Sequence, residues 1–199
     1  KKKINDLKKN IIEFKEKMLK EIILKEKKNI NFTNNLHKLK KCKIVFFSQD
    51  VETDKNNKSN ISQIKKNVDK TIKYLDKNVV FVILSQVNFG FTRKIRFKKK
   101  NLYYQVETLV FGDAVNRAKN PERLIIGMEN ENDEINKVYL NYIKKFNCPL
   151  IKMNYESAEL TKKAINIFLC STITATNQFT ELCEKTSANW EKIKKALIS

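Results

Sequence analysis

The stretch that most constrains this chain is residues 154–185, which contain neither Gly nor Pro and are apolar on nearly every helical face. The spacing predicts one long helix, with Asn154 as its N-cap and Glu156 in its first turn. A helix with this pattern is too apolar for a surface helix, so we expect most of it to be buried. The apolar positions that lead to this expectation are Ala158, Ala164, Ile165, Phe168, Leu169, Ile173, Phe179 and Leu182.

Two polar side chains, Lys162 and Asn166, interrupt this apolar stretch. They are four residues apart and therefore share one face of the predicted helix. A buried lysine is unfavourable unless it has a partner or a chemical task. From the helix alone, two interpretations of Lys162 stay open: its ammonium reaches solvent along the aliphatic stem, or it belongs to a site.

The composition predicts a soluble protein with a real core, formed by one large domain or two small ones. Of the 199 residues, 41% are hydrophobic and 32% are charged. No uncharged run is long enough to span a membrane, and the first residues, KKKINDLKK, have no apolar signal core. We therefore expect a cytoplasmic protein with no membrane partner.

The net charge of +19 would ordinarily suggest a nucleic-acid partner. The excess is nearly all lysine, and it is scattered, whereas arginine, the better phosphate ligand, occurs only four times. The densest cluster, RFKKK at residues 96–100, is interpreted as a solvated loop. We therefore expect no nucleic-acid partner, and keep a basic nucleic-acid binder as the weakest hypothesis, which predicts salt-sensitive binding.

Cysteine, histidine and glycine exclude several kinds of site. The four cysteines lack metal or redox spacing and are interpreted as small core residues. His37 is the only histidine, so we expect no histidine-based triad and no metal site. Gly90, Gly112 and Gly127 are the only glycines and lie far apart, which excludes a glycine-rich phosphate loop within these residues.

Apolar runs alternate with helical patterns along the first three quarters of the chain. This order indicates an α/β fold with a mostly parallel sheet, right-handed crossovers and helices on both faces. We expect buried strands at residues 43–48, 78–85, 123–127 and 149–153, with a short strand at 29–32. We expect helices at residues 4–28, 36–41, 61–75, 109–119, 133–146 and 187–198, besides the long helix.

Strands stop at residue 153, so we expect two domains, a sheet domain over residues 1–153 and a helical unit over residues 154–199. Ligands of such sheets bind beyond the carboxyl ends of the strands. The loops after Ser48, Ser85 and Gly127 are expected at those ends, and residues 49–53 and 86–92 are the first candidates for ligand contacts.

Four segments, in this order, resemble the UDP-glucose/GDP-mannose dehydrogenase family. They are DVETD at residues 50–54, VILSQVNFGFTRKI at 82–95, YYQVETLVFGDAVNRAKNPERLIIG at 103–127 and ESAELTKKAINIFL at 156–169. The resemblance implies a Rossmann-like NAD-binding domain over residues 1–153 and the start of an all-α dimerisation domain from residue 154. It also implies NAD as cofactor, a nucleotide-sugar substrate and a homodimer formed through the central helix.

The activity implied by the resemblance is oxidation of the C6 alcohol of a nucleotide sugar to the uronate, for polysaccharide and cell-envelope precursors. Lys162 and Asn166 match the family's Lys and Asn on the central helix, whose implied role is to hold the developing alkoxide or oxyanion. Glu107 matches a glutamate that positions the sugar and helps to activate the hydrolytic water. Taken alone, Glu107 equally suits a charge at a helix N-terminus.

The resemblance implies cofactor contacts for Thr53, Ser85, Gln86 and Glu107. Gln86 is also implied in catalysis, because it replaces a threonine that helps to hold the catalytic water, and its amide can both donate and accept. Taken alone, Thr53 also suits an ordinary turn threonine. The chain departs from the family at five further positions, where prolines or a second glutamate are common: Glu52, Asn88, Phe89, Val106 and Phe111.

The family's glycine-rich turn and its catalytic cysteine have no counterpart in these residues. In the family, that cysteine captures the aldehyde as a thiohemiacetal, which is oxidised to a thioester and hydrolysed. Cys170 and Cys183 match core positions of the central helix instead. We therefore expect a partial chain without its first βα unit, which binds NAD poorly and is inactive alone. The alternative hypothesis is a non-catalytic dimerisation or interaction module derived from the same family.

Overall fold

The structure is a computed structural model, and it describes residues 2–13, 15–51 and 60–198. The chain forms two compact units, Lys1–Leu160 and Thr161–Ser199, which are described separately. The domain boundary expected between residues 153 and 154 stays a prediction.

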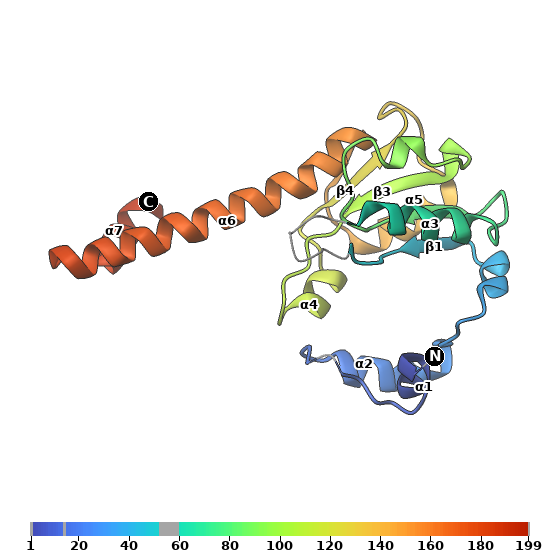
Figure 1. Cartoon of the computed structure of the whole chain (residues 1–199), viewed down its shortest axis with the longest axis horizontal. Helices are drawn as coiled ribbons and strands as arrows, with labels where there is room; N and C mark the ends of the chain where they lie inside the picture. Colours follow the sequence, from blue (N-terminus) through green and yellow to red (C-terminus); the bar gives the residue numbers. More distant parts are fainter. Residues whose placement is uncertain (1, 14, 52–59, 199) are drawn as a thin grey trace. The chain divides into compact units, whose positions relative to one another are not determined.

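The first unit is built on one sheet whose strands lie in chain order (Figure 1). The strands are β1 (Ile44–Phe47), β2 (Val80–Ile83), β3 (Leu102–Val106), β4 (Leu124–Met128) and β5 (Leu150–Asn154). β1, β2 and β3 are mutually parallel, β4 is antiparallel to β3, and β5 is parallel to β4. The expected mostly parallel α/β sheet is confirmed, and β2, fully buried, is an interior strand as its apolar pattern predicted.

The reversed direction of β4 corrects one expectation about the ligand edge. Val106, the last residue of β3, pairs with Ile125 near the start of β4. The residues after Gly127 therefore lie at the opposite edge of the sheet from the carboxyl ends of β1 and β2. They do not join the loops after Ser48 and Ser85, as the sequence had led us to expect.

Strand β3 was missed by the sequence analysis, which placed no strand between residues 85 and 123. It is nevertheless the central strand, and Leu102, Tyr103 and Tyr104 are almost completely buried. The run LYYQV is short and follows the polar stretch KKKN at residues 98–101, so its pattern is too brief to stand out from the sequence before it.

The α-helices are α1 (Lys2–Lys8), α2 (Leu19–Lys25), α3 (Ile61–Ile72), α4 (Ala114–Lys119), α5 (Lys137–Ile143), α6 (Tyr155–Thr186) and α7 (Trp190–Ile198). The 3-10 helices are η1 (Lys27–Asn29), η2 (Leu36–Lys41), η3 (Thr92–Lys94), η4 (Lys99–Asn101) and η5 (Lys144–Phe146). The long helix is confirmed as α6, and the Asn154 side chain caps it by accepting a hydrogen bond from the Ser157 N–H at 2.8 Å.

The single helix expected at residues 4–28 is wrong. The chain takes the left-handed conformation at Asn10, with φ of 61°, and at Met18, with φ of 63°, which separates α1 from α2. Residues 29–32 do not form the expected strand, whereas η2 confirms the short helical piece. α4 and α5 are shorter than expected.

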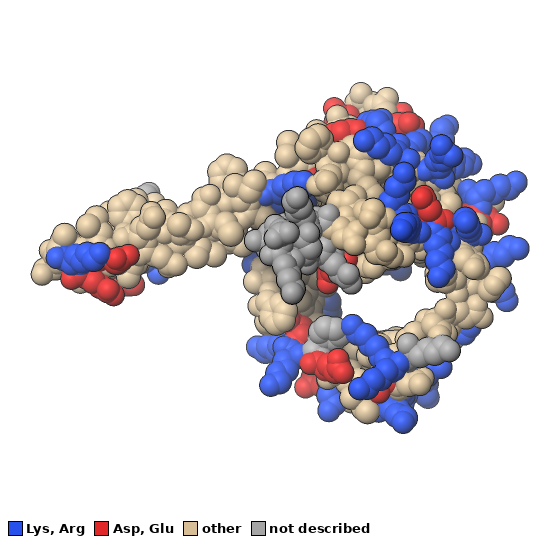
Figure 2. All heavy atoms as spheres, in the orientation of Figure 1, with Lys and Arg blue, Asp and Glu red and all other residues tan. Residues whose placement is uncertain are grey.

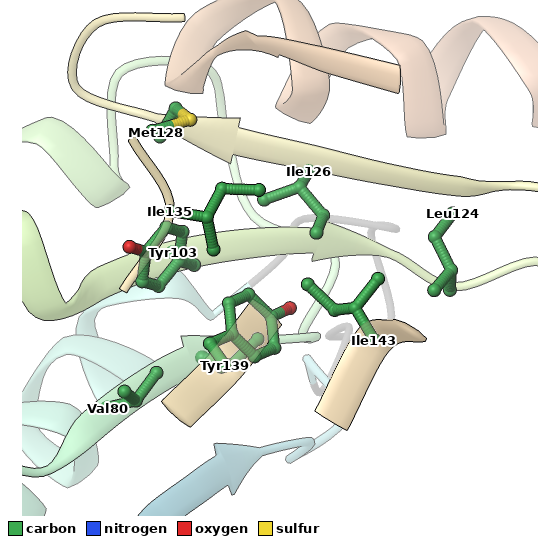
Figure 3. Close-up of a cluster of buried hydrophobic side chains, with 9 residues drawn as sticks. Val80, Tyr103, Leu124, Ile126, Met128, Ile135, Tyr139 and Ile143 are labelled. Carbon is green, nitrogen blue, oxygen red and sulfur yellow. The ribbon is translucent and has the colours of Figure 1, made fainter. Parts of the chain in front are cut away.

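The main core lies between the sheet and α5 (Figure 3). Tyr139 and Ile143 of α5 point towards the sheet, where Tyr103 and Ile126 receive them. The rings of Tyr103 and Tyr139 have centroids 4.7 Å apart, and the Tyr139 hydroxyl donates to Gln105 Oε1 at 2.7 Å. The buried hydroxyl is therefore satisfied within an apolar cluster.

The opposite face of the sheet carries the first turn of α6, at residues 155–160. A Cβ built on Gly127 would lie 2.7 Å from the Ala158 Cβ and 3.3 Å from the Tyr104 Cβ. The Tyr155 hydroxyl also donates to the Leu102 carbonyl at 2.9 Å. Because α5 covers one face and this turn covers the other, helices on both faces of the sheet are confirmed.

The second unit consists of the rest of α6 and of α7. The rings of Phe179 and Trp190 stack at 6.4 Å and join the two helices. The expectation that α6 is mostly buried is wrong for this unit, because many of its apolar side chains are more than half exposed. These side chains are Ile167, Phe168, Leu169, Ile173, Phe179 and Leu182.

The two units differ in the charged side chains that they show. Figure 2 shows Lys and Arg side chains dispersed over the sheet unit, while α6 shows mostly uncharged atoms.

Of the four cysteines, only Cys183 is buried; Cys148 is half-buried, and Cys42 and Cys170 are exposed. The interpretation of the cysteines as core residues is therefore wrong for Cys42 and Cys170, whereas Cys183 is buried and Cys148 packs against the core. Among the described residues, no helix is long and apolar enough to cross a membrane.

Candidate functional site

The candidate site lies at the edge where the parallel strands β1, β2 and β3 end. Gln86 follows β2, and Glu107 follows β3 directly. The two strands pair in the register Ile83↔Tyr104. Gln86 and Glu107 are each three residues beyond this pair, so adjacent strands deliver them to the same edge of the sheet.

Ser85 lies beneath this edge and is almost completely buried. Its hydroxyl donates to the Gln49 carbonyl at 2.6 Å, and the Gln49 side chain in turn accepts from Asn67 Nδ2 of α3 at 2.7 Å. The Ser85 side chain thus ties the loop after β2 to the loop after β1. Any effect of this hydroxyl on a ligand would act through the shape of these two loops.

Glu107 is half-buried and lines a cavity of about 270 Å³. Burial raises the pKa of the Tyr142 phenol above its ordinary value, and the negative charge of Glu107 adds to this effect. A carboxylate at the rim of such a cavity can accept a proton or hold the hydroxyl groups of a ligand. The cavity is lined by Phe46, Leu84, Gln105, Val106, Glu107, Thr108, Leu109, Arg117, Ala118, Pro121, Arg123, Leu124, Tyr142 and Phe146.

The other predicted site residues fall into separate parts of the chain. Lys162 and Asn166 lie on α6 in the second unit, where Lys162 is half-buried and Asn166 is exposed. Gln86 is exposed at the edge of the sheet. Thr53 lies outside the described residues. The structure therefore brings Ser85, Gln86 and Glu107 together at one edge, and the chemical roles of all six residues stay predictions.

A buried carboxylate that contacts the connection after β2 was missed by sequence reasoning. Glu159, near the start of α6, is completely buried and accepts hydrogen bonds from the Gly90 and Thr92 N–H groups. Burial raises the pKa of its carboxyl group, while the hydrogen bonds from Thr92 and Gly90 oppose that shift. The available signal was that Glu159, like Lys162, is a charged residue inside the apolar stretch.

Donor and acceptor groups at this edge suit one part of a dinucleotide cofactor. The Gln86 amide and the Glu107 carboxylate can hydrogen-bond a ribose or a carboxamide. A pyrophosphate needs a dense set of backbone donors, which a glycine-rich turn at a helix N-terminus supplies, and these 199 residues contain only three scattered glycines. The residues present therefore fit the ribose and nicotinamide portions and not the pyrophosphate.

Comparison with known proteins identifies both parts of the chain. Residues 1–143 match the NAD-binding domain of the UDP-glucose/GDP-mannose dehydrogenase family, and residues 156–199 match its central domain. An uncharacterized protein of Methanocaldococcus jannaschii is 32% identical over 85% of this chain and 20% of its own length. The UDP-glucose 6-dehydrogenase of Rickettsia felis is 26% identical over 98% of this chain and 46% of its own length.

A solved structure of similar fold is the GDP-mannose dehydrogenase of Pseudomonas aeruginosa. It superposes with a TM-score of 0.86 at 15% identity, over 99% of this chain and 49% of its own. The chain thus spans about half the length of these dehydrogenases. The match to the NAD-binding domain confirms the expected cofactor class, NAD, at the level of the family. The chain belongs to the UDP-glucose/GDP-mannose dehydrogenase family.

Proposed function

We propose that the protein containing this chain oxidises the C6 alcohol of a nucleotide sugar, such as UDP-glucose, to the uronate used in polysaccharide and cell-envelope precursors. The proposal is supported most directly by Glu107, a half-buried carboxylate that follows the central strand and lines a cavity in a chain of this family. NAD, when bound, is the hydride acceptor.

The overall reaction is balanced by two hydride transfers and one water molecule. The primary alcohol loses two hydrides, gains one oxygen from water, and releases three protons as the carboxylate forms. Glu107 accepts a proton from the attacking water, because a half-buried carboxylate that lines a cavity is a suitable base. Gln86, whose amide both donates and accepts, orients that water.

Lys162 and Asn166 stabilise the negative charge that develops on the substrate oxygen. An ammonium and an amide donor on one helix face stabilise an alkoxide or oxyanion more than the neutral alcohol. Lys162→Met should therefore lower kcat. An unchanged rate would instead favour the interpretation in which Lys162 only extends its ammonium to solvent.

The test of the function is NADH formation by the complete protein with UDP-glucose, compared with GDP-mannose. Glu107→Gln should lower kcat by about 10²–10⁴-fold, the usual contribution of a general base. Glu131→Gln, the same change at an exposed position after β4, is the matched control and should keep the wild-type rate. A Glu107→Gln variant with wild-type kcat would exclude the role proposed for Glu107.

The 199 residues alone should form no NADH above background, because a pyrophosphate site with a glycine-rich turn is not among them. NADH formation by the isolated chain with a nucleotide sugar would contradict this. Failure of the complete protein with every UDP- or GDP-hexose would contradict the proposed function itself.

We also propose that α6 pairs with a second copy of the chain. The same pairing is expected if the chain is a non-catalytic dimerisation module. Residues 164–180 contain no charged side chain, and several apolar side chains there are exposed, among them Phe168 at 74%. An exposed apolar surface of this kind marks an interaction site. The uncharged, Thr- and Ala-containing helix suits close contact with an identical helix.

Sedimentation equilibrium tests this pairing. Phe168→Asp should weaken dimerisation by at least about 30-fold, as expected for an apolar side chain central to an interface. Phe111→Asp is the control, since Phe111 is 95% exposed but lies in the sheet unit. A monomeric wild-type chain, or an unaffected Phe168→Asp dimer, would exclude pairing through α6.

A further inference from the structure

The connection after β2 is held at both of its ends by buried polar contacts. At its start, the Ser85 hydroxyl donates to the Gln49 carbonyl at 2.6 Å. Towards its end, the Gly90 N–H donates to Glu159 Oε2 at 2.5 Å, and the Thr92 N–H donates to Glu159 Oε1 at 2.8 Å. Both carboxylate oxygens of Glu159 are therefore used to fix the backbone of this connection.

Between these two anchors, one apolar side chain faces inwards and the polar ones face solvent. Val87 is 1% exposed, whereas Gln86 and Asn88 are exposed. Ser85 is 4% exposed, so the residues on both sides of Gln86 are buried. These two buried neighbours restrict the directions that the exposed Gln86 side chain can take at the carboxyl edge of the sheet.

The backbone at Gly90 explains why a distant carboxylate is needed. Gly90 has φ of 77°, in the left-handed region, so the chain turns sharply between Phe89 and Phe91. Its half-buried N–H group donates to Glu159, which is 69 residues later in the sequence. Without the carboxylate of Glu159, this N–H group and the buried N–H group of Thr92 would both lose their acceptor.

We propose that Glu159 is a positioning residue for the reaction: its carboxylate fixes the Gly90–Thr92 backbone and thereby orients Gln86 towards the catalytic water. This inference rests on the proposed function, in which Gln86 orients that water. Glu159 itself does not touch the substrate and acts only through the backbone of the connection after β2. Its side chain is completely buried, and each of its two carboxylate oxygens accepts a hydrogen bond from a different backbone N–H group, an arrangement that an incidental surface contact does not show.

A double-mutant cycle in the complete protein tests the proposal. Glu159→Gln removes the charge and places an amide NH₂ against one of the two N–H donors. With Gln86 present, it should lower kcat by about tenfold or more, because small displacements of a positioned group reduce the rate strongly. In a Gln86→Ala background, the same change should lower kcat by less than about twofold, since the group it positions is gone.

A purely structural role for Glu159 would give equal losses in both backgrounds, and that result would overturn the proposal. Glu156→Gln is the matched control: it lies on the same turn of α6 and loses its own contact with Arg93, but it touches neither Gly90 nor Thr92. Its kcat should stay within about twofold of wild type. A loss as large as that of Glu159→Gln would show that any weakening of this turn suffices, which also overturns the proposal.

Amide hydrogen exchange supplies a readout that does not depend on activity, and its wild-type measurement does not depend on a variant. The Gly90 and Thr92 amides of the wild-type protein should exchange slowly, and in Glu159→Asp, whose carboxylate is one methylene shorter, they should exchange faster. Unprotected amides in the wild-type protein would overturn the inference. If the complete protein forms no NADH while these amides are protected, the proposed function fails and the anchoring contact still stands.

Discussion

Gly127 on β4 lies so close to Ala158 on α6 that a Cβ at position 127 would be 2.7 Å from the Ala158 Cβ. The same Cβ would lie 3.3 Å from the Tyr155 backbone Cα. Two backbones approach here, so a side chain can be added only if the helix moves away from the sheet. The glycine is required by this close approach, since its backbone is not in the left-handed region.

Gly127→Ala should therefore lower the free energy of unfolding by about 1–3 kcal/mol, the usual effect of overpacking a core. Chemical denaturation measures the change. Adding Ala158→Gly to this variant should recover part of the loss, although glycine within a helix itself costs about 1 kcal/mol. Strict additivity of the two changes would contradict a direct clash between these positions.

The neighbouring tyrosines of β3 should respond in opposite ways to loss of their hydroxyl groups. The Tyr103 hydroxyl donates to the Lys100 carbonyl at 3.0 Å and accepts from the Asn136 N–H at 2.8 Å. The Tyr104 hydroxyl is buried and has no hydrogen-bond partner among the described residues. Burial raises the pKa of Tyr104, and the charge of Glu159 adds to this shift.

Tyr103→Phe should destabilise the fold by about 1–3 kcal/mol, because the half-buried Asn136 N–H loses its acceptor. Tyr104→Phe should be neutral or slightly stabilising, since it removes a polar group that is buried without a partner. Urea denaturation midpoints of the two variants provide the comparison. Equal losses in both variants would mean that the Tyr104 hydroxyl has a partner in solution.

The ion pair between Arg93 and Glu156 predicts a pH effect of known sign. The guanidinium hydrogen-bonds the carboxylate through Nε and Nη2, and this contact lowers the pKa of Glu156. A lowered pKa means that the folded state binds the proton more weakly than the unfolded state. The pair therefore contributes stability above the ordinary pKa of glutamate, and this contribution is lost as the pH falls through the lowered pKa.

Arg93→Met should return the pKa of Glu156 towards its ordinary value, as measured by NMR titration of the carboxyl carbon. The side chains are 42% and 37% exposed, so the loss of stability near neutral pH should stay below about 1 kcal/mol. Arg123→Met is the control, because Arg123 contacts Glu122 and should leave the Glu156 titration unchanged. An unshifted pKa in Arg93→Met would show that the pair does not form in solution.

Ser85→Ala should destabilise the fold by about 1–3 kcal/mol, because the Gln49 carbonyl loses a buried donor. Ser62→Ala removes a hydroxyl that hydrogen-bonds Asn60 at 2.8 Å at an exposed position, and it should change stability by less than about 0.5 kcal/mol. Thermal unfolding compares the two. If the two serine variants were equally stable, Ser85 would not be tying the two loops together.

Apolar periodicity predicted the strands around Val45, Val82 and Ile126 and the helices α3 and α5, because each of these elements buries one or both faces. It also predicted the helix α6, although many apolar side chains of α6 are exposed. It failed for β3, which is short and follows a lysine cluster, and at Asn10 and Met18, where the backbone conformation interrupts a helical pattern. Local sequence gives little warning of a left-handed residue that is not glycine. It also gave no indication that β4 runs antiparallel to β3.

For the candidate site, Gln86 and Glu107 could be singled out from the resemblance of their segments to a known family, and the pairing of β2 with β3 places both at one edge. Glu159 lies in one of these segments, but its contacts could not be found in this way. Its partners, the Gly90 and Thr92 N–H groups, are more than 65 residues distant, and backbone groups leave no signature in the sequence.

The sequence by itself determined the class of the fold, the family and the long helix with its Asn154 cap, because these depend on composition, periodicity and motifs that are local along the chain. Only the tertiary structure decided the direction of β4, the close contact of Gly127 with Ala158 and the capture of two backbone amides by Glu159. These features depend on which distant segments meet, and that is set by the packing of the whole sheet unit against its helices.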